Sequence, residues 1–511
     1  MSLIAVSDLS FCYEGSSEPV FEHVSFQIDT DWKLGFTGRN GRGKTTFLRL
    51  LQGLYEYEGS ITASVEFDYF PFDVEDEQAD TLEVILSRMP EVEFWRLRRE
   101  LARLQLEEEV LYRPFDTLSY GEQTKVLLAA LFLRENHFLL IDEPTNHLDR
   151  EGRALLGEYL AEKKGFILVS HDRNFLDACV DHMLSINRAD IQVQKGNFSV
   201  WYENRSRQDA WEMAENQRLK KEIGHLKEAA RRTRNWGDQI ENQKIGRTPY
   251  LQEKSIGMRA YVGEKSRRMQ QRRKNLERRQ ERAMEEKSGL LKNVETAEDL
   301  KLMPLTYHKE VLAEAEDLQA GYGGRPVCQP VSFQIRREDR ISLQGKNGCG
   351  KSTILKAILQ AAGVKTPEGT GTESDLFVKG MLRTGSGLVI SYVPQDTSWL
   401  RGSLMEYGDA LGLEAPLFLA LLAKLDVPRE QFAMPMETFS EGQKKKVLLA
   451  ASLCTRAHLY VWDEPLNYID VYSRIQIENL IRTWNPSILL VEHDQMFTER
   501  IGARTVEVRR L

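Results

Sequence analysis

Two short runs of glycine, lysine and hydroxyl residues have the types and spacing of a loop that wraps around phosphate groups. The first is GRNGRGKTT, from Gly38 to Thr46, and the second is GKNGCGKST, from Gly345 to Thr353. Each follows a run of β type and precedes a helical apolar pattern, so backbone N–H groups and a helix N-terminus would face the phosphates. A chance glycine-rich turn could explain one such match, but not two in register with everything downstream. The predicted contacts are Gly38, Asn40, Gly41, Gly43, Lys44, Thr45 and Thr46 in the first loop, and Gly345, Asn347, Gly348, Gly350, Lys351, Ser352 and Thr353 in the second.

Downstream of each loop, a short apolar run ends in two neighbouring carboxylates. These are Asp142 with Glu143, and Asp463 with Glu464. A buried strand would carry both acids to its C-terminal edge. Asp142 with Thr45, and Asp463 with Ser352, would then hold Mg²⁺, while the two glutamates would polarise an attacking water. An ordinary solvated turn is the alternative.

Each copy also has a histidine after an apolar strand run and a tyrosine about 25 residues before its loop. His171 and His493 fit a contact to the terminal phosphate of a nucleotide, whereas a lone histidine at a strand end is usually structural. Tyr13 and Tyr322 could stack on a base, with a core tyrosine as the alternative.

The whole set recurs in the same order roughly 310 to 320 positions later, which indicates a duplicated domain. A chain of 511 residues is too long for one core. We predict α/β domains at residues 1–203 and 304–511, with a connecting segment at 204–303. The second copy holds about 14 extra residues between its loop and the later motifs.

Composition favours a cytoplasmic protein. Apolar runs fall short of the 18 or so residues that a membrane span needs, and the chain is expected to carry no leader. The five cysteines form no CxxC pair, so neither structural disulfides nor zinc are expected.

The net charge of −8 hides a strongly basic middle. Residues 205–292 hold 24 Lys and Arg against 13 Asp and Glu, which is a net charge of +11. The remainder, with 45 basic and 64 acidic residues, carries −19. A polyanionic partner should therefore meet the middle of the chain.

This basic segment has apolar residues at helical spacing from about Arg205 to Arg234 and from about Lys265 to Lys292. Two helices of about 30 residues would form a long antiparallel hairpin of about 45 Å. Its tip, at about 235–263, mixes aromatic, apolar and basic residues that could stack on bases and pair with phosphates. The candidates are Trp236, Lys244, Arg247, Tyr250, Lys254, Met258, Arg259 and Tyr261. A solvated coiled-coil spacer is the alternative, although a spacer would alternate its charges.

LSYGEQ (Leu118 to Gln123) and FSEGQ (Phe439 to Gln443) complete a resemblance to the ATP-binding cassette ATPases, over almost all of both halves. The resemblance implies ATP and Mg²⁺ as cofactors, and two halves that close head to tail on two ATP molecules. Ser119, Gly121 and Glu122 would cap the nucleotide held by the second loop, and Ser440, Gly442 and Gln443 that held by the first. It also implies that Gln395 contacts Mg²⁺ and water, whereas the first half has Phe72 there, which cannot.

Two cassettes, a basic helical hairpin and no membrane span together resemble the ABC-F family, most closely the Lsa and Vga type of antibiotic-resistance factor. The strings that support this are WKLGFTGRNGRGKTT, YRPFDTLS, GFILVSHDR and WDEPLNYID. The resemblance implies that ATP binding docks the protein at the exit site of the 70S ribosome. The hairpin would then approach 23S rRNA at the peptidyl-transferase centre and the P-site tRNA, and no further protein subunit or membrane is needed.

Three other functions remain open at this stage. A housekeeping ABC-F translation factor would have nearly the same sequence features. The ATP-binding subunit of a transporter would have no use for a long basic hairpin, and a DNA-repair ATPase of the zinc-binding kind would need cysteine ligands that are absent.

Overall fold

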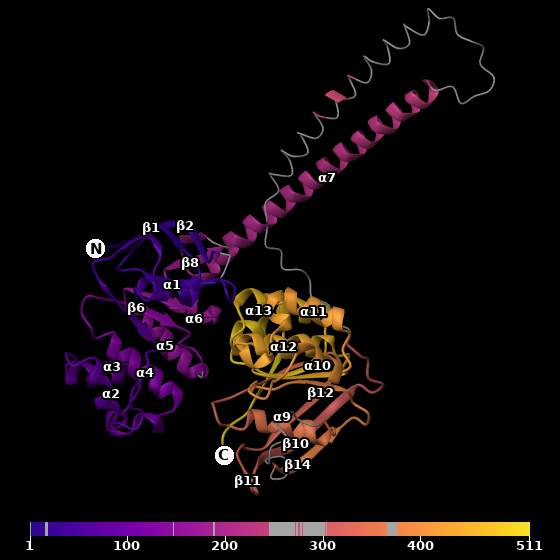
Figure 1. Ribbon diagram of the computed structural model, residues 1–511. Coiled ribbons are helices and arrows are strands. Elements are labelled where there is room, and N and C mark those ends of the chain that lie inside the picture. Colours follow the sequence, from indigo (N-terminus) through magenta and orange to yellow (C-terminus); the bar gives the residue numbers. More distant parts are fainter. Residues whose placement is uncertain are drawn as a thin grey trace, which may run out of the picture. The chain divides into compact units, whose positions relative to one another are not determined.

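A computed structural model describes residues 2–15, 19–146, 148–187, 190–244, 271, 274–275, 278, 302, 304–364 and 376–511. The chain divides into two units (Figure 1). One consists of Met1–Trp201 with Ala297–Leu511 and holds both α/β halves, and the other is Tyr202–Thr296. The tandem α/β fold class predicted from the sequence is therefore present.

The first half combines a small antiparallel sheet with a larger, mostly parallel one. The antiparallel sheet has the strand order β2-β1-β4, and the second sheet has the order β5-β6-β7-β3-β8-β9, antiparallel only between β8 and β9. The strands are β1 (Leu3–Phe11), β2 (Phe21–Asp29), β3 (Lys33–Thr37), β4 (Glu58–Thr62), β5 (Glu66–Phe70), β6 (His137–Asp142), β7 (Phe166–Val169), β8 (His182–Asn187) and β9 (Asp190–Lys195). The helices are α1 (Lys44–Leu51), α2 (Thr81–Arg88), α3 (Phe94–Arg103), α4 (Tyr120–Leu131), α5 (Arg150–Ala161) and α6 (Arg173–Cys179), with 3₁₀ turns η1 (Glu108–Tyr112) and η2 (Phe115–Thr117).

The second half repeats this plan. Its parallel sheet has the order β15-β16-β17-β13-β18, and β10 pairs with β11, β12 and β14 in an antiparallel sheet. The strands are β10 (Val311–Tyr322), β11 (Arg325–Pro326), β12 (Val331–Arg336), β13 (Arg340–Gln344), β14 (Leu376–Thr384), β15 (Ile390–Val393), β16 (Leu459–Asp463), β17 (Ile488–Val491) and β18 (Arg504–Glu507). The helices are α9 (Lys351–Ala361), α10 (Leu404–Ala410), α11 (Ala415–Lys424), α12 (Glu441–Cys454), α13 (Val471–Trp484) and α14 (Gln495–Arg500), with 3₁₀ turns η4 (Arg429–Ala433) and η5 (Met436–Thr438).

The parallel strands are short and apolar because both of their faces are covered. All residues of β7, β16 and β17 are buried, and β6 is buried from Phe138 to Ile141. In the first half, helix α1 packs on this sheet through Phe47, Leu48 and Leu51. The carboxyl ends of β6 and β16 therefore come out at the same edge as the phosphate loops.

Helix α7 (Phe198–Lys244) leads from the first half into the second unit. Its 47 residues extend beyond Arg234, where the sequence pattern predicts an end, and pass through Trp236 and Gly237. The physical reason is that a single glycine costs a helix only about 1 kcal/mol, and no proline interrupts this stretch. Four residues of the predicted return helix are helical, namely Gln271, Lys274, Asn275 and Arg278, while its remainder lies outside the described residues.

The helices can also be compared with the requirements of a lipid bilayer. Over the described ranges of the chain, none is both long enough and apolar enough to cross a membrane.

Candidate nucleotide-binding sites

Each phosphate loop runs into its helix through a left-handed glycine. Gly43 (φ 93°) caps α1, and Gly350 (φ 98°) caps α9. A Cβ on Gly43 would lie 2.5 Å from a Val20 methyl group, so the tight turn excludes a side chain there. The loop lysines fold back on their own loops, because Lys44 Nζ donates to the Gly38 carbonyl at 2.8 Å and Lys351 Nζ to that of Gly345 at 2.8 Å. Both ammonium groups thus lie in the centre of the cradle where a phosphate is expected.

The first cavity, of about 940 Å³, lies between the loop of the first half and FSEGQ of the second. It is walled by thirteen of the predicted residues, namely Tyr13, Asn40, Gly41, Gly43, Lys44, Thr45, Thr46, Asp142, Glu143, His171, Ser440, Gly442 and Gln443. Gly38 does not line it and serves instead as the acceptor for Lys44. The phosphate loop of the first half therefore faces the FSEGQ segment of the second half, as the resemblance implies for a head-to-tail pair.

The second cavity, of about 690 Å³, is its counterpart between the loop of the second half and LSYGEQ of the first. It too is walled by thirteen predicted residues, namely Ser119, Gly121, Glu122, Tyr322, Asn347, Gly348, Gly350, Lys351, Ser352, Thr353, Gln395, Glu464 and His493. Asp463 lies beneath it with 2% of its surface exposed, and Gly345 lines a neighbouring hollow. Ser119 and Ser440 cap α4 and α12 with their hydroxyl groups, so each capping segment points a helix N-terminus at its cavity.

The predicted magnesium ligands meet in both halves. Thr45 Oγ1 donates to Asp142 Oδ2 at 2.9 Å, and a hydrogen bond joins Ser352 to Asp463. Asp463 Oδ1 is buried and has no hydrogen-bond partner among the described residues, and burial raises the pKa of this carboxyl to about 6. The remaining predicted ligand, Gln395, donates its side-chain N–H to Glu464 Oε2 at 2.8 Å. Within the described ranges no three His, Cys, Asp or Glu residues cluster as a metal site. Thr45 with Asp142, and Ser352 with Asp463, would supply oxygen ligands to Mg²⁺.

The two predicted catalytic glutamates have different surroundings. Glu464 Oε2 accepts from Gln395 Nε2 at 2.8 Å and from Asn467 Nδ2 at 2.6 Å. Glu143 Oε1 lies 3.4 Å from His171 Nε2, and this oxygen has no hydrogen-bond partner in the described part of the chain. The Glu143 carboxylate does accept a hydrogen bond from the backbone of His171. The pocket lining beside Glu143 contains Phe72, which supplies no amide.

Their ionisation differs accordingly. Burial, reinforced by Asp142, raises the pKa of Glu143. Burial also acts to raise the pKa of Glu464, but the interaction with His493 and the charges of Lys445 and Lys351 outweigh it, and this pKa is lowered. At neutral pH the carboxyl group of Glu464 is therefore the more fully ionised of the two, and only an ionised carboxylate can accept a proton from water.

Sequence reasoning missed several side chains around these sites. Tyr69 donates to Asp142 Oδ2 at 2.9 Å, beside the Thr45 contact. Lys445 and Lys446 are 2% and 1% exposed, and Lys446 Nζ bonds to Asp470 Oδ2 at 2.9 Å. The available signal was the string KKK at the start of an otherwise apolar helix pattern.

Contacts between the halves differ at the two cavities. Beside the first, Asn40 Nδ2 donates to the Tyr468 carbonyl at 2.8 Å, and Arg39 pairs with Asp426. Arg173, which is fully buried, pairs with Glu478 of the other half. The first side of the interface is thus held by polar contacts that are buried or partly buried.

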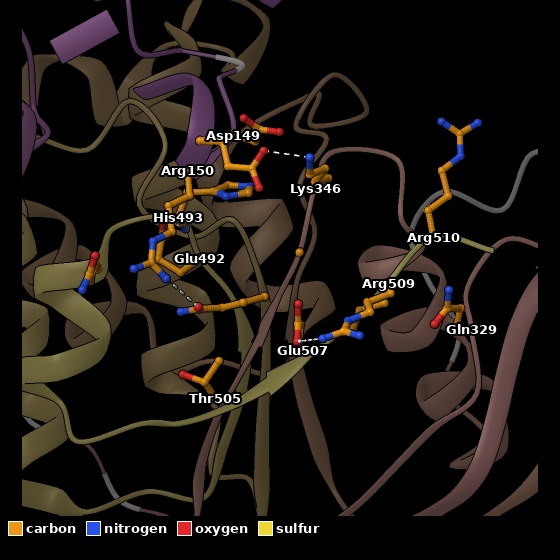
Figure 2. Close-up of a pocket in the computed structure, with 15 residues that line it drawn as sticks. Asp149, Arg150, Gln329, Lys346, Glu492, His493, Thr505, Glu507, Arg509 and Arg510 are labelled. Carbon is orange, nitrogen blue, oxygen red and sulfur yellow. Dashed lines mark hydrogen bonds and ion pairs between the residues drawn. The ribbon is translucent and has the colours of Figure 1, made fainter. Parts of the chain in front are cut away.

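Beside the second cavity the contacts are solvent-exposed. A hollow of about 630 Å³ lies there, and Figure 2 shows Asp149, Arg150, Lys346 and His493 among the residues that line it. Lys346 pairs with Glu151 at 2.7 Å, and the two side chains are 69% and 72% exposed. Glu507 and Arg509 pair at 2.8 Å in the same hollow, so its charges largely neutralise one another.

The predicted nucleic-acid contacts cannot be placed in the same way. Trp236 and Lys244 are residues of helix α7. The other six, Arg247, Tyr250, Lys254, Met258, Arg259 and Tyr261, lie outside the described residues.

Comparisons with known proteins identify relatives in sequence and in fold. A family model described as ABC transporter matches residues 21–146 and 328–467, which together make up half of the chain. The ribosome protection protein VmlR of Bacillus subtilis (strain 168) is 26% identical over 504 residues, covering 96% of this chain and 84% of VmlR. The energy-dependent translational throttle protein EttA of Mycobacterium tuberculosis (strain CDC 1551 / Oshkosh) is 25% identical over 534 residues, covering 94% and 87%. The solved complex of archaeal ribosomal stalk protein aP1 with ribosome recycling factor aABCE1 shares the fold with a TM-score of 0.58 at 18% identity, over 99% of this chain and 90% of that one.

Two composite cavities between duplicated α/β halves define a tandem ABC ATPase, and the chain belongs to the ABC transporter family. Domains of this family bind ATP, generally with Mg²⁺, and hydrolyse it. Within the family, similarity to VmlR and EttA over nearly the whole chain identifies it as an ABC-F type protein.

Proposed function

We propose that this protein is an ATP-dependent ribosome-binding factor that protects the peptidyl-transferase centre against lincosamide, pleuromutilin and streptogramin A antibiotics. The observation that carries the proposal is similarity over nearly the whole chain to a protein named for ribosome protection. The basic segment at 205–292, with its net charge of +11, supports an RNA partner. Such a role places the protein in the cytoplasm.

In this proposal ATP binding at the two cavities closes the halves and lets the protein dock at the exit site of the 70S ribosome. Residues 1–203 and 304–511 act as the ATPase domains, and residues 204–303 extend towards 23S rRNA and the P-site tRNA. The tip residues, including Trp236, Arg247 and Tyr250, stack on bases and pair with phosphates. Hydrolysis, with Glu143 and Glu464 acting on water, then releases the protein.

A double Glu143→Gln and Glu464→Gln variant tests the docking step. With ATP and Mg²⁺ it should co-sediment with 70S ribosomes, because closed halves can no longer reopen by hydrolysis. With ADP, or with Lys44 and Lys351 both changed to Ala, it should remain in the supernatant. A double variant that stays in the supernatant with ATP would exclude ATP-gated ribosome binding.

A second candidate is a housekeeping translation factor, which similarity to a translational throttle protein favours. A strain lacking the gene separates the two functions. If the gene raises the inhibitory concentration of the three drug classes at least about fourfold and leaves drug-free growth unchanged, protection is supported. A growth defect without drug, and no change in resistance, would support the housekeeping role instead.

A further inference from the structure

Lys445 lies on α12, immediately below the second cavity, and is buried with 2% of its surface exposed. Its ammonium donates to three backbone carbonyl groups, those of Pro394 at 2.7 Å, Gln395 at 3.2 Å and Asp463 at 3.2 Å. A lysine ammonium has three N–H donors, so all three are used.

These carbonyls belong to the two segments that carry the polar groups of the second site. Pro394 and Gln395 form the loop after β15, and Asp463 ends β16 immediately before Glu464. The side chains of Gln395 and Glu464 meet through a 2.8 Å hydrogen bond. One ammonium therefore fixes the backbone at both ends of that bond.

The first half provides an internal comparison. Counting from Ser119 and Ser440, the position of Lys445 is held there by Thr124, and that of Gln395 by Phe72. Where the second half has its tethered loop, the first has a hollow of about 360 Å³ lined by Phe72, Thr124 and Glu143. The fold therefore forms around this position without a lysine.

We propose that Lys445 is a positioning residue for ATP hydrolysis at the second cavity, where it holds Gln395 against Glu464 so that the glutamate can orient the attacking water. A merely structural role does not explain why this position carries a charge, because burying an ammonium costs several kcal/mol before its contacts are counted. Thr124 shows that an uncharged side chain can occupy the same place in the fold.

This proposal rests on the ATPase part of the proposed function and does not involve the ribosome. The test uses the full chain without ribosomes, in a Glu143→Gln background, so that turnover reports the second cavity. Lys445→Met should lower kcat for ATP about 10- to 100-fold, since a shift of about 1 Å in a positioned group costs that much, while KM changes less than about threefold. If the Glu143→Gln protein itself hydrolyses no ATP, the assignment of ATPase activity to the second cavity is wrong. The hydrogen-exchange measurement below then still tests whether Lys445 holds the loop.

A double-mutant cycle separates positioning from general support of the fold. If Lys445 acts through Gln395, adding Lys445→Met to Gln395→Ala lowers kcat no further than Gln395→Ala alone. Multiplicative losses in the double mutant, or a kcat for Lys445→Met equal to that of the background, would overturn the proposal. Lys445→Thr, the residue of the first half, replaces Lys445→Met if the latter does not fold.

Hydrogen exchange on the nucleotide-free protein gives a readout that is independent of activity. Lys445→Met should speed exchange of the backbone amides from Gln395 to Thr397 at least about tenfold, because the loop loses its tether. Lys444→Met is the matched control, since it removes the neighbouring lysine of the same helix and should leave these amides and kcat unchanged. Equal exchange in the two variants would show that Lys445 does not hold the loop.

Discussion

At the scale of single residues, the two predicted catalytic glutamates are unequal in their partners. Glu464 is held by Gln395 and Asn467, whereas Glu143 has a buried oxygen without a hydrogen-bond partner in the described part of the chain. The pKa of Glu464 is lowered and that of Glu143 is raised. We therefore expect most of the turnover to occur at the second cavity.

Single substitutions test this inequality. Glu464→Gln should lower steady-state ATP hydrolysis by at least about 100-fold, as expected for loss of a general base, while Glu143→Gln should lower it less than about fivefold. The measurement is phosphate release at saturating ATP, with equilibrium binding of a fluorescent ATP analogue as the control for intact cavities. Equal losses in the two variants would contradict the inequality.

The sequence predicts part of this difference and misses the rest. Phe72 against Gln395 is visible in the alignment of the two copies, because both follow a proline after a strand. Lys445 is not visible in that way, since a lysine at the start of a helix usually faces solvent. Its burial depends on the loop after β15, because Pro394 in that loop lies 51 residues away in the chain.

At the scale of elements, the start of each phosphate helix and the strand ends could be predicted, because glycine patterns and buried apolar runs have few alternatives. The end of α7 could not, because a single Gly237 and an adjacent Trp236 do not suffice to stop a long charged helix. Sequence patterns also do not predict which helices of one half contact each other. The attachment of α3 to α5 in the first half is an example.

Glu100 on α3 is 2% exposed and accepts a hydrogen bond from Tyr159 of α5 at 2.9 Å and one from Lys163. Burial acts to raise the pKa of Glu100, but these two partners outweigh it and lower the pKa. A carboxyl group with a lowered pKa stabilises the fold above its ordinary range, and this stabilisation is lost as the pH falls through the lowered value.

Glu100→Gln should therefore lower the free energy of unfolding by about 1.5–3 kcal/mol at pH 7, the usual contribution of hydrogen bonds to a charged group. The gap between variant and wild type should narrow as the pH falls below about 4.5, the ordinary carboxyl pKa. The urea midpoints of the two proteins at a series of pH values measure this difference in stability. A gap that stays constant down to pH 4 would show that the charge of Glu100 is not the cause.

At the scale of the whole molecule, the two halves are joined through a buried group of charges. Arg173 of the first half pairs with Glu478 and lies 3.6 Å from Asp494, which Arg474 also contacts at 3.1 Å. Breaking a buried ion pair from one side is costly because the remaining charge stays in a medium of low polarity. The cohesion of the two halves should therefore depend on this group.

Arg173→Met should lower the free energy of unfolding by about 3–5 kcal/mol in the transition that separates the halves. Adding Glu478→Gln should restore part of this free energy, because it removes the unpaired charge. The matched control is Glu151→Ala at the exposed pair with Lys346, which should cost less than about 1 kcal/mol. Thermal and urea unfolding of the four proteins measure this. Similar losses for Arg173→Met and Glu151→Ala would mean that the buried pair has no special weight.

The Arg173–Glu478 pair also determines which polypeptides can associate. By the duplication, Arg173 corresponds to Gln495 and Glu478 to Gly157. Two copies of the second half would bring each Glu478 opposite a glutamine, and two copies of the first would bring each Arg173 opposite a glycine. Either homodimer would lose the Arg173–Glu478 pair, and among the described residues Glu478 would keep only Arg500 of its own half as a partner, at 3.4 Å. The halves, if expressed as separate polypeptides, should therefore combine preferentially as a heterodimer. Fusion in one chain then supplies the two halves in equal amounts, as a pair that is complementary at this contact.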